Sequence, residues 1–61
     1  MTKQKQLILQ ETFEACSLAM DELTVHANDL ESVGFLGDSI DIREAIGIIE
    51  NAINNMRQRH S

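Results

Sequence analysis

The apolar residues of this chain recur at alternating spacings of four and three, and this pattern most constrains the fold. In the first half they are Leu9, Phe13, Cys16, Met20, Leu23, Ala27 and Leu30. In the second half they are Ile42, Ile46, Ile49, Ile53 and Met56. Heptad spacing gathers these side chains on one face of a helix, where they pack against another helix. It therefore predicts an all-α antiparallel hairpin, with a long helix over about residues 3–33 and a shorter one over about 39–58.

The segment between the two helices, SVGFLGDSID, is unusually apolar for a loop. Gly34 follows the first helix at the distance of the left-handed residue that ends many helices. Phe35 would then fold back onto Leu30, which is the hydrophobic contact of a Schellman cap. We predict that the apolar loop residues form a lid that closes one end of a helical bundle, with a partner-docking tip as the alternative. The lid residues are Val33, Phe35, Leu36 and Ile40.

The start of the second helix has several competing capping residues. Asp41 and Glu44 have the spacing of a capping box, and Asp38 and Ser39 are alternatives one turn earlier. With a cap at Asp41 the second helix is roughly 25 Å long against roughly 45 Å for the first. Arg57 would then lie level with residues near Cys16, and the first three turns of the long helix would have no partner within the chain.

That overhang predicts a homodimer, because its apolar residues need a second molecule to cover them. Two helices alone also leave half of each apolar face open to water, which a four-helix bundle of two hairpins would cover. The expected dimer interface consists of Leu7, Ile8, Leu9, Phe13, Cys16 and Met20.

Length and composition favour the same assembly. The 61 residues suit a single domain, and a chain this short is marginally stable as a monomer without a disulfide, a metal or a partner. Cys16 is the one cysteine, so an internal disulfide is excluded and a reducing compartment, the cytoplasm, is favoured. No apolar run approaches the ~20 residues of a membrane span, and no signal peptide is visible.

The outer face of the first helix carries a small apolar strip. Leu18 and Val25 are seven residues apart and lie outside the heptad face, with acidic residues on both sides. A solvated face with two exposed apolar residues explains this pattern, and a recognition surface for a basic, partly apolar partner protein is the functional interpretation. The predicted outer strip consists of Glu14, Leu18, Asp21, Glu22, Val25 and Asp29.

No catalytic, cofactor-binding or metal-binding residues are predicted. Glu22, His26 and Asp29 share one helical face, but without a second His or Cys they indicate a solvated face rather than a metal site. The serines have no convincing His–Asp partners, and a two-helix hairpin offers no deep pocket. The formal charge of −5 disfavours nucleic acid unless the few bases gather on one face.

Two family resemblances bear on function. The start MTKQ, the length and the long-helix hairpin resemble the Rop family of plasmid-encoded RNA-binding four-helix bundles. That family presents a basic face with an aromatic residue, whereas the bases here are at the termini and the outer face is acidic. The whole chain, including GFLGDSIDIREAIGIIENAI, is similar to the small helical proteins of the exo–xis early region of lambdoid phages.

The second resemblance implies a non-enzymatic regulator that acts on a host protein and influences lytic versus lysogenic development. Two alternatives remain open: a Rop-like RNA-binding regulator that uses Lys3, Lys5, Arg57 and Arg59, or an acidic decoy that mimics DNA.

Overall fold

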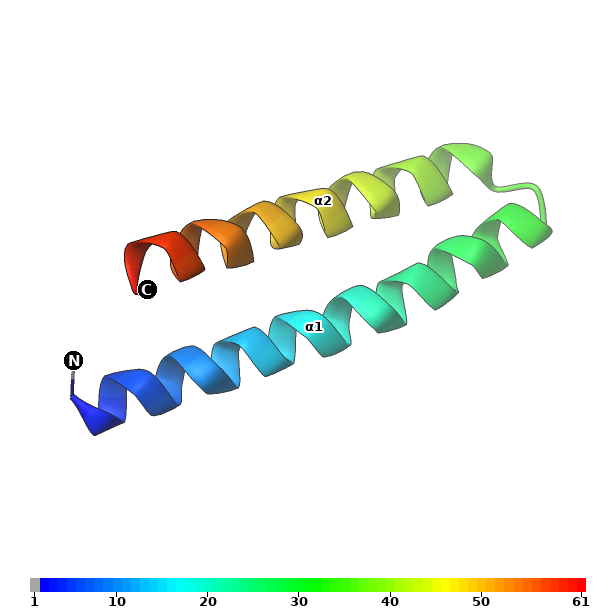
Figure 1. Ribbon diagram of the computed structural model, residues 1–61. Coiled ribbons are helices and arrows are strands. Elements are labelled where there is room, and N and C mark those ends of the chain that lie inside the picture. Colours follow the sequence, from blue (N-terminus) through cyan, green and yellow to red (C-terminus); the bar gives the residue numbers. More distant parts are fainter. Residues whose placement is uncertain (1) are drawn as a thin grey trace.

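The computed structural model describes residues 2–61, which form two long α-helices joined by a tight loop. Helix α1 spans Lys3–Ser32 and helix α2 spans Leu36–Arg59. The helices lie side by side and run antiparallel, so the two ends of the chain meet at one end of the molecule and the loop is at the other (Figure 1). The all-α two-helix hairpin predicted from the heptad spacing is confirmed.

The ends of α1 follow from capping. Thr2 is the N-cap, and its Oγ1 accepts a hydrogen bond of 3.2 Å from the backbone N–H of Lys5. At the other end, Gly34 has φ 88°, which only glycine adopts without strain. The N–H of Gly34 donates to the carbonyl of Glu31 and that of Phe35 donates to the carbonyl of Leu30, at 3.1 and 2.9 Å. These two bonds define the predicted Schellman cap.

Helix α2 begins at Leu36, several residues earlier than predicted, and this start corrects the capping-box interpretation. Asp38, Ser39 and Asp41 all lie inside the helix, and Phe35 is the N-cap residue. The backbone N–H of Ser39 donates a helical hydrogen bond of 3.1 Å to the carbonyl of Phe35, so the first turn of α2 is already formed before Asp41. The Schellman cap directs the chain so sharply that α2 starts at once, without a side-chain cap at Asp41.

The earlier start makes α2 longer, and the N-terminal overhang is therefore shorter than the three turns predicted. Its 24 residues extend about 36 Å along the axis, so α2 accompanies α1 over most of its length. The guanidinium of Arg57 lies 5.6 Å from the ring centroid of Phe13, almost one turn beyond the level of Cys16. The last residue of α2, Arg59, is thus level with about residue 11, so residues 3–10 of α1, roughly two turns, extend beyond α2. His60, directly after α2, lines a hollow together with Lys5 and Leu9 of this overhang.

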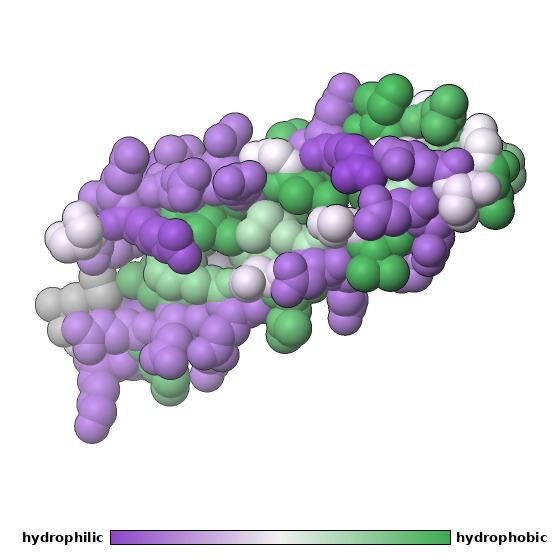
Figure 2. All heavy atoms as spheres, turned by 45° about the vertical axis from the view of Figure 1, so that its right-hand side comes forward, coloured by the Kyte–Doolittle hydropathy of each residue, from purple (hydrophilic) through white to green (hydrophobic). Residues whose placement is uncertain are grey.

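The apolar faces of the two helices meet as the heptad spacing predicts. All twelve heptad positions are buried or half-buried. However, the only buried hydrophobic residues among residues 2–61 are Ala27 and Ile53. Figure 2 shows hydrophobic side chains gathered between the helices on the face in view, bordered by hydrophilic ones on the outer sides. The seam between the helices is thus a core that is open on at least one side.

The dimensions of the molecule explain why the core stays open. The chain is a rod of 48 × 16 × 10 Å, and its thickness is that of one helix. Its radius of gyration is 14.5 Å, against about 10.5 Å for a compact chain of this length. Its accessible surface is 4763 Å², against about 4,000 Å² for a compact monomer of this mass. Stable domains usually pack two layers of secondary structure, and this hairpin supplies one.

Candidate interaction surfaces

The outer strip lies on the side of α1 that faces away from α2. The side chains of Leu18 and Val25 are 63% and 58% exposed, and they are separated by about 10.5 Å along the helix axis. The four acidic residues predicted to frame them are exposed as well. All six predicted residues therefore form one accessible surface, with an apolar centre and a negative border. That surface consists of Glu14, Leu18, Asp21, Glu22, Val25 and Asp29.

The residues of the predicted dimer interface divide into two groups. Leu9, Phe13, Cys16 and Met20 are half-buried in the seam, and Cys16 has a free thiol there. Leu7 and Ile8 are more than half exposed.

The four predicted lid residues form an exposed apolar cluster at the loop end. Each of their side chains is more than half exposed in the single hairpin, and Phe35 is 57% exposed. Val33 and Phe35 also line a shallow hollow, which we call the loop hollow, together with His26, Asp29 and Leu30. The hairpin by itself leaves this end of the seam uncovered.

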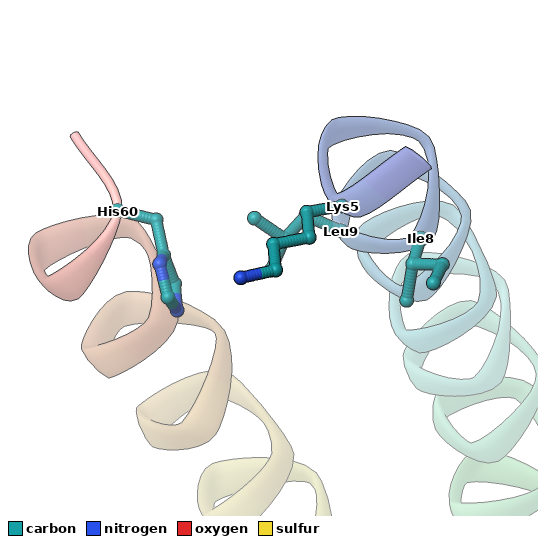
Figure 3. Close-up of a pocket in the computed structure, with 4 residues that line it drawn as sticks. All are labelled: Lys5, Ile8, Leu9 and His60. Carbon is teal, nitrogen blue, oxygen red and sulfur yellow. The ribbon is translucent and has the colours of Figure 1, made fainter. Parts of the chain in front are cut away.

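A second hollow, which we call the terminal hollow, lies at the opposite end of the rod. It has a volume of about 520 Å³ and is lined by Lys5, Ile8, Leu9 and His60. Figure 3 shows Lys5 and Leu9 reaching from α1 towards His60 at the end of α2. The hollow is apolar apart from the Lys5 ammonium and the His60 ring. The sequence did not reveal it, because the predicted register, with Arg57 near Cys16, placed His60 almost one turn farther from Lys5.

A polar cluster near the loop joins the two helices. The hydroxyl of Ser39, a buried residue, donates to Glu31 Oε1 at 2.9 Å. Arg43 Nε donates to the same oxygen at 3.0 Å, and Arg43 Nη2 donates to Asn28 Oδ1 at 2.7 Å. These bonds hold α2 at one register along α1. The sequence alone did not predict them, because pairing residues 8–15 positions apart requires the length of the loop to be known.

This cluster also affects the charge of Glu31. The hydrogen bond from Ser39, and then the one from Arg43, hold the pKa of the Glu31 carboxyl below its ordinary value of 4.5. Because the side chain is exposed to water, its ion pair with Arg43 serves mainly to fix the register and adds little stability.

The two flanks of the seam differ in composition. In the heptad pattern, positions e and b of each helix lie on one flank and positions g and c on the other, and antiparallel helices bring like flanks together. The first flank carries the Glu31–Arg43 ion pair and Arg57. The second carries small and apolar residues halfway along the rod, and we call it the alanine flank. Its central residues are Ala15, Ala19, Ala45, Ile48 and Ala52. Ile48 is 70% exposed.

Among residues 2–61, no group of three or more His, Cys, Asp and Glu side chains is placed to hold a metal ion. Neither helix in this part of the chain has an apolar stretch that could cross a membrane.

Comparison with known proteins adds no relative: no protein-family model, no curated protein and no solved structure matches this chain.

Proposed function

We propose that this chain is a small non-enzymatic regulatory protein that forms a homodimeric four-helix bundle and binds a host protein through its outer strip. The proposal places it in the bacterial cytoplasm, as a product of a phage or another mobile element. Its similarity to the exo–xis proteins suggests a role in the choice between lytic and lysogenic development.

The open seam supports the homodimer. Just two hydrophobic residues of the described chain are buried, although the heptad pattern runs along both helices. A second hairpin would add the missing layer and complete the burial of the half-buried heptad residues. Sedimentation at micromolar concentration tests this step, and a monomer would refute it.

The exposed apolar centre of the outer strip is the observation that carries the proposed binding of a host protein. Leu18 and Val25 point away from the seam, so packing within the hairpin does not explain them. A partner that covered them would gain affinity from the apolar centre, while its Lys or Arg side chains met the surrounding carboxylates. The acidic border would mainly raise the association rate and select basic partners.

The experiment is a capture comparison between two double variants. Leu18→Ser with Val25→Ser removes the apolar centre, and Leu36→Ser with Ile40→Ser makes the same kind of change at the exposed loop end. We expect the first variant to lose a partner that the wild type and the second variant both capture from bacterial lysate. Dimer content and melting temperature should stay close to wild type in the first variant. Equal capture by both variants would show that the outer strip is not the binding surface.

Nucleic acid is the competing class of partner, and the salt dependence of binding distinguishes it from a protein partner. An RNA or DNA complex held by the terminal bases would weaken steeply as salt rises, because released counterions dominate its affinity. We expect no measurable binding of RNA or DNA at 0.1 M salt, roughly physiological in strength. Binding with a steep salt dependence would favour the Rop-like alternative.

A further inference from the structure

Charge is distributed unevenly along the rod. Arg57 lies beside Phe13 and Ser39 beside Glu31, so position 20 of α1 is level with position 50 of α2. The half nearer the loop, residues 21–50, contains eight acidic side chains and one basic one, which gives a net charge of −7. The half nearer the termini contains four basic side chains and two acidic ones, which gives +2. The two ends of the rod therefore carry opposite net charges, negative at the loop end and positive at the terminal end.

The alanine flank shows this polarity most clearly. Helical spacing places Lys5 and Arg59 at its terminal end and no carboxylate beside them. The loop end of the same flank carries three exposed acidic residues, Asp29, Asp38 and Asp41, and Glu22 lies nearer the middle, level with Ile48. The opposite flank mixes both signs, with Arg43 bonded to Glu31. A partner on the alanine flank thus meets a positive end, an apolar middle and a negative end.

Both hollows lie on the alanine flank, one at each end. The terminal hollow is bordered by Lys5 and Ile8, and the loop hollow by Asp29 and Val33. Their centres, near positions 7 and 31 of α1, are equally far from Ala19. A two-fold axis through Ala19 would therefore lay each hollow of one copy against the other hollow of the second copy.

We infer that a second copy of this chain covers the alanine flank in antiparallel orientation, with its loop end against the terminal hollow. The inference rests on the proposed dimer and specifies its geometry. The apolar side chains of Val33 and Phe35 would meet the apolar wall of Ile8 and Leu9. The carboxylates of Asp38 and Asp41 would meet Lys5 and Arg59 of the other copy, and the two-fold axis makes each of these contacts twice.

Charge and area both favour this arrangement. A parallel dimer would bring the two −7 halves together within the ~10 Å screening length at 0.1 M salt, whereas the antiparallel dimer pairs each −7 half with a +2 half. The accessible surface of 4763 Å² exceeds that of a compact monomer by about 760 Å². That excess is close to the ~800 Å² that each partner buries in a stable interface.

Distances between spin labels test the orientation directly. In a Cys16→Ala background, Gly37→Cys places a label near the loop, at a position with no neighbouring atom within 4 Å of an added Cβ. Gly37 is level with position 33, fourteen residues from Ala19, so the antiparallel dimer separates two such labels by about 42 Å along the rod. A parallel dimer keeps them within about 25 Å, the width of two helices.

A mixed sample gives the reciprocal distance. Labels at Gly37→Cys in one copy and Gln58→Cys in the other should lie closer together than two Gly37→Cys labels do. A dimer with the opposite ranking would overturn the orientation and leave the proposed dimer intact. A monomer, seen as no dipolar coupling and a monomeric sedimentation coefficient, would overturn both.

Charge reversal provides a second test. Lys5→Glu with Arg59→Glu should raise the dimer dissociation constant about tenfold or more, because each reversed residue would face partner carboxylates. Lys3→Glu with Arg57→Glu changes the net charge equally on the opposite flank and serves as the control, with helix content checked by circular dichroism. An equal effect of both variants would overturn the inferred interface.

Discussion

Two isoleucines of α2 that differ in exposure provide a measurement of whether the alanine flank is covered. Ile53 lies in the seam and is 6% exposed, whereas Ile48 lies on the alanine flank and is 70% exposed. Ile53→Ala and Ile48→Ala remove the same three carbon atoms from the same helix. Differences between their effects therefore report the surroundings of each side chain and not helix propensity.

The structure gives the expected size of each effect. For Ile53→Ala, a buried position, we expect a loss of about 2–5 kcal/mol in the free energy of unfolding. For Ile48→Ala in a lone hairpin, where about 30% of the side chain is covered, three carbons at ~0.8 kcal/mol each give roughly 0.7 kcal/mol. If a second copy covers Ile48 fully, the loss per chain rises to roughly 2.4 kcal/mol before any cavity forms. A chain of this length is typically stable by about 3–9 kcal/mol, so these differences are large.

The assay is urea unfolding followed by circular dichroism at two protein concentrations. A dimer unfolds at higher urea when it is more concentrated, so the concentration dependence reports association independently of the substitutions. A loss of about 0.7 kcal/mol or less for Ile48→Ala, beside a large loss for Ile53→Ala, would refute burial of the alanine flank. A small loss for Ile53→Ala would show instead that the seam is not the core.

Three further substitutions test the local structure. Gly34→Ala should lower stability by about 1–2 kcal/mol, because an alanine at φ 88° is strained; a melting temperature equal to that of the wild type would contradict the Schellman cap. Gly47→Ala should raise stability by up to about 1 kcal/mol, because no atom lies within 4 Å of the added Cβ and alanine favours helix; thermal melting that shows a loss instead would indicate close packing there. Glu31→Gln should flatten the loss of stability at acid pH. The pKa of Glu31 is lowered in the folded chain, so its contribution is present above 4.5 and lost as the pH falls through the lower folded value; urea midpoints at pH 3 and pH 7 that shift equally in wild type and variant would rule this out.

The sequence predicted the two helices well, because their apolar faces repeat over many turns. The heptad residues from Leu9 to Leu30 and from Ile42 to Met56 all lie in the seam. The end of α1 was equally predictable, since Gly34 has a conformation that other residues avoid. In both cases the structure requires a particular kind of residue at a particular spacing, apolar at the heptad positions and glycine at the end of α1. A single sequence is therefore enough to predict these features.

The start of α2 was not predictable from local rules. Asp38, Ser39 and Asp41 are all good capping residues, yet the helix begins before any of them, at Leu36. The choice depends on tertiary contacts, because Ser39 uses its hydroxyl to bond Glu31 across the loop. This difference at the start of α2 changed the register along the seam, and with it the expected overhang.

The outer strip was predictable as a surface, since residues outside the heptad face are expected to meet water. Leu18 and Val25 are exposed as the spacing requires. The terminal hollow was not, because His60 approaches Lys5 only when α2 has its full length. Features that depend on the register between the two helices can be identified only in the structure, whereas features that lie on one helix can be predicted from the sequence.

The tight loop at Gly34 also determines the order in which the hairpin can assemble. The separation in sequence between facing residues grows steadily with distance from the loop. It is 8 for Ser39 and Glu31 and reaches 44 for Arg57 and Phe13. Closing a short chain segment costs less conformational entropy than closing a long one. Pairing of the two helices is therefore expected to begin at the cluster of Glu31 and Arg43. Pairing can then proceed one turn at a time towards the termini. The last contacts to form on folding, and the first to open in thermal fluctuations, are those beside Lys5 and His60.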